Sequence, residues 1–277
     1  YINSDESVDS QESGFVPKLN IKWQVDDDHM LYATYSEGFR SGGGNALRSN
    51  SVLPRKFDSD FLTNYELGAK TTWLDGALQL NAVAFHMVWE DIQVSVEDPQ
   101  PQVFTLGIVN FPGAEIDGFE LDFVWLPAQG WELSGTGAWL DAELSQTSTQ
   151  YGVTAVEGSQ LPLAPEWKAS LGAQYTFPTV LFGGVPYLRL DYSYNGESLN
   201  ALGGLESIIV SPPPDEQQAY SIVDFSLGLE ADGWSAQFFV DNLSDERAEQ
   251  FFSNRWGKKR LSINDPRSFG VSVRKNF

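Results

Sequence analysis

The sequence predicts an all-β protein built from long antiparallel strands, and two observations carry that prediction. Apolar and polar residues alternate with a period of two along the whole chain, whereas a helical period is almost absent. The connections are rich in Gly, Pro, Asp and Ser, as turns require. Even the last segment alternates: Phe269, Val271 and Val273 fall on one side. Ser272 and Arg274 fall on the other, so one face of this strand is apolar and one is polar.

The alternating segments number about eleven, and most have the length of roughly ten residues that a tilted strand needs to cross a bilayer. The expected strands are 15–25, 29–39, 61–74, 77–92, 114–126, 131–144, 165–177, 186–196, 219–230, 233–243 and 267–277. The segment starting at Ala77 becomes apolar on both faces in its second half, which predicts a bulge or a covered inner face. The segment 103–110 is expected either as a further strand or as a hairpin arm within a loop.

The connections alternate between short turns and long polar stretches. We therefore expect one end of the structure to carry short turns and the other to carry long connections. Short connections follow Val25, Trp73, Trp125 and Leu229, with a slightly longer one after Phe177. The long stretches are 40–60, 91–113, 145–164, 196–217 and 244–266. A soluble β-sandwich has shorter strands and lacks this asymmetry. Long strands, unequal ends and aromatic residues near strand ends together favour a transmembrane antiparallel β-barrel, with the long connections extracellular.

Composition excludes several classes of protein. Seventeen basic and 38 acidic residues give a net charge of −21, which argues against binding a nucleic acid. The chain has no Cys, so it has no disulfide framework and no thiolate metal site. No apolar run approaches the roughly 18 residues of a membrane-spanning helix. The acidic, Ser-rich start has no signal peptide, so we expect that signal to be removed or to lie upstream of Tyr1.

Several blocks of the chain resemble the TonB-dependent outer-membrane receptors, and they occur in order over essentially its whole length. The closing blocks "FFVDNLSDERA" and "NDPRSFGVSVRKNF" resemble the last two strands of the receptor barrel, although Ala248 stands where an aromatic residue is common. The signature positions are Asp241, Asn242, Leu243, Asp245 and Arg247. Residues 31–45, 64–94, 113–125 and 161–177 are similar to earlier parts of the same barrel. The terminal Phe277 matches the aromatic end that serves these barrels as an assembly signal.

The resemblance implies a receptor in the outer membrane of a Gram-negative bacterium. Such a receptor has a barrel of about 22 strands closed by an N-terminal plug, on which TonB pulls to admit a scarce nutrient such as a ferric siderophore. The chain shows about half of those strands and neither plug nor TonB box. We therefore expect 1–277 to be the C-terminal part of the barrel, beginning with a loop segment at 1–14. Upstream sequence or another chain is expected to complete the barrel, and TonB to act through that missing part.

A cluster of basic residues in the last long connection is the strongest candidate for ligand binding. "NRWGKKR" places four of the seventeen basic residues within six positions of an acidic chain. Charge-assisted contacts and a stacking aromatic ring suit an anionic small molecule such as a ferric siderophore. The alternative is a patch that touches lipopolysaccharide phosphates or balances acidic neighbours. The candidate ligand-binding residues are Arg40, Arg48, Arg55, Lys56, Arg255, Trp256, Lys258, Lys259 and Arg260.

Acidic residues are plentiful, but their pattern fixes no metal or cofactor site. Those at alternate positions within strands are expected to face a polar lumen, with Arg189 as a nearby partner. They are Glu120, Asp122, Asp191, Asp224 and Glu230. The acidic stretches 91–99 and 215–216 could bind a divalent cation through oxygen ligands, yet nothing in them sets a coordination geometry. The glycines of "FRSGGGN" precede no helix, so we interpret them as a flexible rim and not as a phosphate loop.

Two other functions stay open from the sequence. A self-contained outer-membrane barrel acting as a passive pore or an adhesin would show the same strand pattern. An outer-membrane hydrolase would need a catalytic histidine, and of the two histidines His29 falls in a short turn while His86 lies in mid-strand. The expected function is transport, so no residue is assigned a catalytic role.

Overall fold

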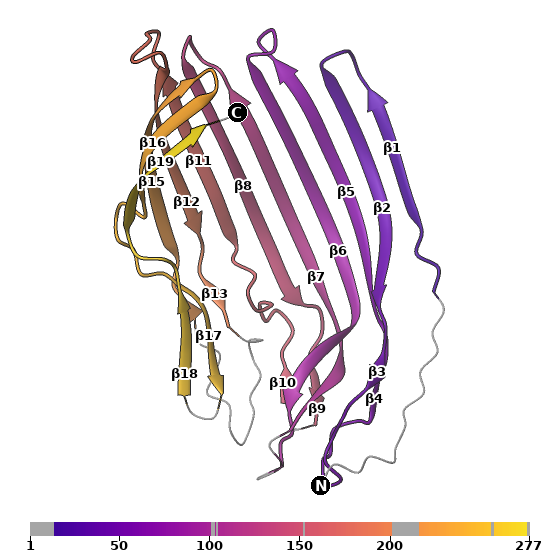
Figure 1. Cartoon of the computed structure of the whole chain (residues 1–277). Helices are drawn as coiled ribbons and strands as arrows, with labels where there is room; N and C mark the ends of the chain where they lie inside the picture. The colour runs from indigo at the N-terminus through magenta and orange to yellow at the C-terminus, as the bar shows by residue number, and fades with distance from the viewer. Residues whose placement is uncertain are drawn as a thin grey trace.

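The computed structural model describes residues 14–100, 103, 105–151, 153–200, 216–255 and 258–275 (Figure 1). Almost all of the expected loop segment 1–14 lies outside the described residues, and so do Trp256 and Phe277. Every element in the described ranges is a β-strand. Among these residues, no helix is long and apolar enough to cross a membrane.

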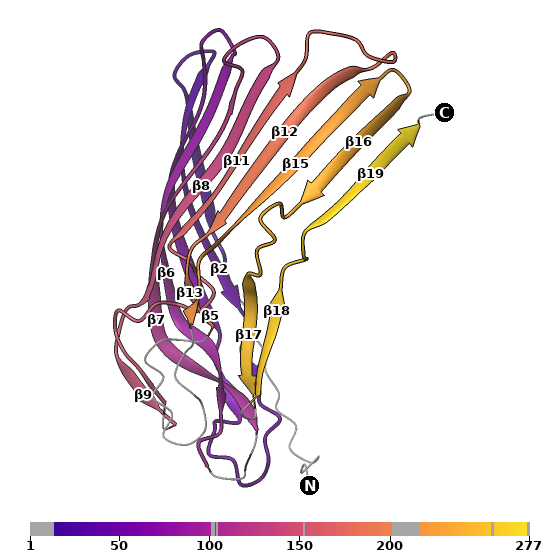
Figure 2. The ribbon, with the colours of Figure 1, turned by 90° about the vertical axis from the view of Figure 1, so that its left-hand side faces the viewer.

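Eleven long strands form one antiparallel sheet that follows the order of the sequence. They are β1 (Lys18–Gln24), β2 (His29–Arg40), β5 (Asp60–Trp73), β6 (Leu78–Glu97), β7 (Leu106–Trp125), β8 (Trp131–Leu144), β11 (Trp167–Thr176), β12 (Val185–Asn195), β15 (Tyr220–Ala231), β16 (Trp234–Asp241) and β19 (Ser268–Lys275). Each expected strand has its counterpart, so the prediction of an all-β antiparallel fold is confirmed. The sheet is a single curved wall, and β1 and β19 are its two edges (Figures 1 and 2).

The strand register gathers the apolar residues on one face of the wall. Two rows of directly paired residues on this face are Ile21, Ala33, Leu67, Ala84 and Phe119, and then Leu190, Phe225, Val240 and Phe269. Leu67, in the middle of β5, is 67% exposed, and Phe269, near the start of the edge strand β19, is 79% exposed. An apolar face that the chain itself leaves uncovered is the outward, lipid-facing surface of a membrane barrel.

The opposite face carries polar groups, and glycines on it make room for aromatic rings. A Cβ atom added at Gly68 would lie 2.2 Å from the ring of Tyr32 on the neighbouring strand, which explains a glycine inside β5. Arg189 donates two hydrogen bonds to Asp191, at 2.8 and 2.6 Å, within β12. The expected pairing of Arg189 with an acidic neighbour is thus confirmed, and Asp224 lies directly opposite Asp191 on the same face.

Four of the five long connections contain a short two-stranded ladder. The pairs are β3 (Gly43–Gly44) with β4 (Lys56–Phe57), β9 (Ser148–Gln150) with β10 (Val153–Ala155), β13 (Ser198–Leu199) with β14 (Glu216–Gln217), and β17 (Glu249–Arg255) with β18 (Lys258–Ile263). All of these lie at the same end of the wall, opposite the short turns (Figures 1 and 2).

The fifth long connection differs from the expectation. Residues 91–113 do not form one loop, because β6 and β7 continue through most of this range and pair from Ile92–Phe111 to Glu97–Leu106. Of the segment 103–110, residues 106–110 belong to β7, as a hairpin arm. The irregularity expected in β6 falls at Asp91, whose φ is +54°, and the ladder steps over Asp91 and the facing Pro112. Pro112 has no N–H to donate, which accounts for the break at this point.

Candidate functional site

A compact structure covers part of the long-connection end, and we call it the cap: residues 41–59 together with 92–97 and 106–111. Its centre is a buried apolar cluster to which Leu47 and Leu53 of the first long connection contribute. They pack with Val96, Val109 and Phe111 of the β6–β7 extension. Six of the twelve buried apolar residues in the described part of the chain lie in the cap. The cap is therefore a fixed platform and not a set of loose loops.

Two side chains tie the first connection to the β6–β7 extension. The Asn45 side chain donates from Nδ2 to the carbonyl of Ile108 at 2.7 Å and accepts from the N–H of Ile108 at 2.8 Å, as a neighbouring strand would. The Asp98 carboxylate accepts hydrogen bonds from the Ser51 hydroxyl at 2.5 Å and the Val52 N–H at 2.9 Å. These bonds satisfy polar groups at the cap's edges, where water is largely excluded.

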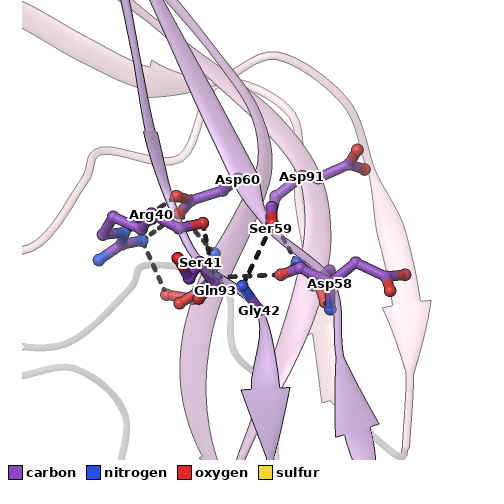
Figure 3. A network of polar contacts seen from close by, with 9 residues as sticks. Arg40, Ser41, Gly42, Asp58, Ser59, Asp60, Asp91 and Gln93 are labelled. Atoms are coloured by element: carbon purple, nitrogen blue, oxygen red, sulfur yellow. Dashed lines mark hydrogen bonds and ion pairs between the residues drawn. The ribbon is translucent and has the colours of Figure 1, made fainter. Parts of the chain in front are cut away.

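An ion pair between Arg40 and Asp60 joins the cap to the wall (Figure 3). Arg40 ends β2, Asp60 begins β5, and the Arg40 Nε lies 3.0 and 2.9 Å from the two carboxylate oxygens. The Asp60 side chain is 2% exposed, whereas that of Arg40 is 52% exposed and its guanidinium carbon lies 4.9 Å from the centre of the Trp89 ring. Burial alone would raise the pKa of Asp60, but hydrogen bonds from Arg40 and from the Gln93 N–H hold it below its usual value.

Gln93 extends this network across the junction (Figure 3). Its backbone N–H donates to Asp60 Oδ2 at 3.2 Å. Its side-chain amide donates to the carbonyls of Ser41 and Asp58 at 3.0 and 3.1 Å. Gln93 follows the break at Asp91 by two residues, so it fixes the direction in which the cap leaves the wall.

The basic residues predicted in the first connection lie in or next to the cap, but their surroundings differ. Arg40 forms an ion pair with Asp60. Arg55 donates to the carbonyl of Leu47 at 3.1 Å and braces the cap from within. Arg48 is exposed beside a turn, and Lys56 is exposed on β4. Of this group, Arg48 and Lys56 present the most accessible charges.

The basic residues of the last connection belong to the β17–β18 hairpin. Arg255 pairs with Lys258 and Asn254 with Lys259 at its tip, and Arg260 is an exposed residue of β18. Trp256 lies outside the described residues. Strand β17 also lies against β14, whereas β4 lies against β7. The structure therefore places the two basic groups at the same end of the wall, but over different strands.

The signature residues of the closing blocks form a cluster of hydrogen bonds in the connection between β16 and β19. We did not predict this role from the sequence. The Asn242 side chain donates to the carbonyls of Glu246 and Asp265 at 2.9 and 3.0 Å and accepts from the Glu246 N–H at 2.8 Å. The Asp245 carboxylate accepts from the Arg267 N–H at 3.0 Å, and this bond is the main reason that the pKa of Asp245 is lowered. Asn242 and Asp245 have positive φ angles of 52° and 55°.

His86, the candidate catalytic histidine, lies on the outward face. Its Nδ1 lies 2.9 Å from Asp117 Oδ1, and its ring stacks at 6.4 Å on that of Tyr65. No serine hydroxyl is among the described contacts of His86.

These features define the class of protein. A curved antiparallel wall with an apolar outward face, a polar inward face, short turns at one end and long structured connections at the other is a transmembrane β-barrel of the outer-membrane type. Residues 2–243 match the family model described as "TonB dependent receptor-like, beta-barrel". The chain belongs to this family, whose members lie in the outer membrane of Gram-negative bacteria.

Curated relatives and solved structures agree with that assignment. The chain is 23% identical over 273 residues to the pesticin receptor of Yersinia pestis, a match that covers 97% of the chain and 37% of the relative. It is 24% identical over 275 residues to the metal-pseudopaline receptor CntO of Pseudomonas aeruginosa, covering 99% of the chain and 35% of the relative. The ferric yersiniabactin uptake receptor FyuA of Yersinia pestis has the same fold, with a TM-score of 0.73 at 22% identity over 94% of the chain and 37% of that structure. The chain thus spans little more than a third of these proteins.

Proposed function

We propose that the chain is part of an outer-membrane receptor that imports a scarce nutrient, namely a ferric siderophore or a similar iron complex, with energy supplied by TonB. The family match is the observation that carries this proposal. The names of the relatives support it, because they include a metal-pseudopaline receptor, a ferric yersiniabactin uptake receptor and a probable TonB-dependent siderophore receptor. The cap supports it as well, since specific capture needs a surface that is fixed before the ligand arrives.

We propose that basic residues on two sides of the long-connection end capture an anionic ligand. On one side are the exposed Arg48 and Lys56 of the cap, and on the other are the basic residues of β17 and β18. Trp256, which follows Arg255 in the sequence, is included in the proposal. Guanidinium and ammonium groups form charge-assisted hydrogen bonds to carboxylate or phenolate oxygens, and an indole ring stacks on a planar chelating group. In this proposal Arg40 and Arg55 do not contact the ligand but hold the cap.

The polar face and the edges of the wall suggest the remaining partners. The polar face, with Arg189 and its acidic neighbours, is the side against which a plug would fit. The peptide groups along the free edges of β1 and β19 would be costly to leave unpaired in lipid. We therefore propose that further strands, from the rest of the receptor or from another chain, pair with both edges, and that lipid and lipopolysaccharide cover the outward face.

Uptake by cells tests this function. A strain that lacks the gene is expected to lose the accumulation of radioactive iron from one ferric siderophore within a panel, and the restored gene to recover it. A protonophore should abolish that accumulation, because TonB draws on the proton gradient. Uptake that resists the protonophore, or that extends to unrelated small solutes, would instead support a passive pore. Unchanged iron uptake with lost surface attachment would support an adhesin.

A further inference from the structure

The turn between β11 and β12 is apolar, which is unusual for a turn that ends in water. Its residues Val180, Leu181 and Phe182 are 66%, 48% and 90% exposed. The corresponding turns at the two sides of the wall are acidic, with Asp26–Asp28 between β1 and β2 and Asp232 between β15 and β16. An exposed cluster of large apolar side chains marks a surface that is covered by something in the working protein.

The backbone of this turn adds a second observation. Leu181 and Gly184 exchange two hydrogen bonds of 2.8 and 2.9 Å, so that Phe182 and Gly183 form a two-residue hairpin turn. Both have positive φ angles, 52° and 83°, as in a type I′ turn. Asn, Asp or Gly suits the first of these positions, whereas a bulky aromatic residue is strained there. A strained backbone conformation at an exposed phenylalanine suggests that the ring of Phe182 has a function.

The turn continues the lipid-facing surface of the wall. Tyr175 at the end of β11 belongs to the outward face, where its ring lies 5.0 Å from that of Trp131 and 4.9 Å from that of Phe177. Tyrosine and tryptophan rings gather where a barrel crosses the boundary between lipid and water. Only Pro178 and Thr179 separate Phe177 from Val180, so the apolar turn lies close to this boundary.

Neighbouring short turns share the same character. Leu74, between β5 and β6, is 65% exposed and has a φ of +56°, and Leu126, between β7 and β8, is 48% exposed. The Leu126 N–H donates to the carbonyl of Ala77 at 2.8 Å, which holds these two turns side by side. Exposed large apolar side chains therefore occur in the turns at the middle of the wall, although the β5–β6 turn also carries the exposed Asp75.

We propose that the Val180–Phe182 turn is a membrane anchor that inserts into the periplasmic leaflet of the outer membrane. Its continuity with the aromatic boundary of the lipid-facing surface favours lipid over a periplasmic protein as the occupant. In this proposal the acidic turns at the two sides of the wall remain in water. Among the short turns, the one between β11 and β12 therefore lies deepest in the membrane. This inference goes beyond the proposed function and does not depend on which ligand the receptor carries.

Spin labelling tests the anchor, because the chain has no Cys and a single introduced one is unique within it. The full-length receptor carrying Leu181→Cys is labelled and reconstituted in phosphatidylethanolamine–phosphatidylglycerol liposomes. Access of oxygen and of a water-soluble nickel chelate is then measured. The label at 181 is expected to be reached by oxygen and shielded from nickel, as at the lipid-facing control Leu67→Cys. The label at Asp232→Cys is expected to be open to nickel, and a label at 181 equally open to nickel would overturn the proposal.

A second variant separates insertion from folding of the turn. Phe182→Asn suits the type I′ geometry better and removes the largest apolar side chain of the tip. In detergent it is expected to unfold at the same temperature as the parent or higher, while in liposomes it should raise the nickel access of the label at 181. No rise in nickel access would contradict the anchor. A label shielded in native outer membranes but open in liposomes would identify a protein partner and also overturn the proposal.

Discussion

The guanidinium of Arg40 covers the almost completely buried carboxylate of Asp60 where β2 ends and β5 begins. The pair is the last one in the register of β2 and β5, at the point where the wall ends and the cap begins. A buried carboxylate that loses its cationic partner is strongly destabilising, so this position has little freedom to change. Arg40, one of the basic residues expected to bind a ligand, thus has its charge paired within the protein.

The first prediction concerns the pH dependence of this junction. Asp60 has a folded-state pKa below its unfolded value, so its contribution to stability is present above about pH 4 and is lost as the pH falls through the folded pKa. Arg40→Gln removes the largest contribution that opposes burial and leaves the Gln93 N–H in place, so the pKa of Asp60 rises. We expect it to rise above the unfolded value, in which case stability is lost as the pH rises. We expect the cap to lose about 1–3 kcal/mol at pH 7 and less at pH 4.5. Hydrogen exchange at Gln93 to Val96, relative to the parent at each pH, measures the loss.

The control for that experiment is the double variant Arg40→Gln with Asp60→Asn. It removes both charges and retains groups of similar shape, so the difference between pH 7 and pH 4.5 should disappear. A pH difference that persists in the double variant would assign the effect to a group other than Asp60.

The second prediction concerns Gly113, which lies where β7 passes from the wall to its extension. A Cβ atom added at Gly113 would lie 2.6 Å from the backbone oxygen of Trp89, which no change of side-chain rotamer can relieve. Gly113→Ala is therefore expected to destabilise the protein by about 1–3 kcal/mol. Gly38→Ala is the matched control, because an added Cβ there has no atom within 4 Å and should change stability by less than about 0.5 kcal/mol. Thermal unfolding in detergent compares the two, and equal losses would contradict the prediction.

Most of the strands could be predicted from the sequence because they alternate by themselves, whereas the second half of the segment starting at Ala77 is apolar on both faces. The same pattern located the short turns and the long connections, since both depend on local composition. The exception was 91–113, where pairing of Ile92–Glu97 with Leu106–Phe111 is supported by Leu47 and Leu53 from a distant segment. A contact between segments so far apart leaves no trace in the local period, so polar composition there was misinterpreted as a loop.

The candidate site was only partly predictable, for a similar reason. Composition marked the basic residues, because four of them within six positions are conspicuous in an acidic chain. It could not show that Arg40 faces Asp60, twenty positions away across two strands. Composition also could not show that the side chain of Asn242 donates to the carbonyls of Glu246 and Asp265. The resemblance to the receptor family had marked Asn242 only as a signature position.

The third prediction concerns Asn242, whose side chain makes three of the hydrogen bonds in the connection between β16 and β19. Asn242→Ala removes three hydrogen bonds and places a Cβ-bearing residue without local hydrogen bonding at a positive φ. Asn242→Gly removes the same bonds but tolerates the φ angle. We expect both variants to lower the unfolding temperature, with the alanine variant about 1 kcal/mol less stable than the glycine variant. Equal stability of the two would show that backbone strain is not important at this position.

The fourth prediction concerns ligand capture by the β17–β18 hairpin. Changing Arg255, Lys258, Lys259 and Arg260 to Ser should weaken binding of an anionic ferric siderophore at least about tenfold, because each charge-assisted contact contributes roughly 1.5–3 kcal/mol. A variant that exchanges Arg and Lys at these positions retains the charges and should bind more tightly than the serine variant. Titration of the purified full-length receptor at low and high salt gives the affinities, and the unfolding temperature checks the fold. Unchanged affinity in the serine variant would limit this cluster to contacts with lipopolysaccharide or with acidic neighbours.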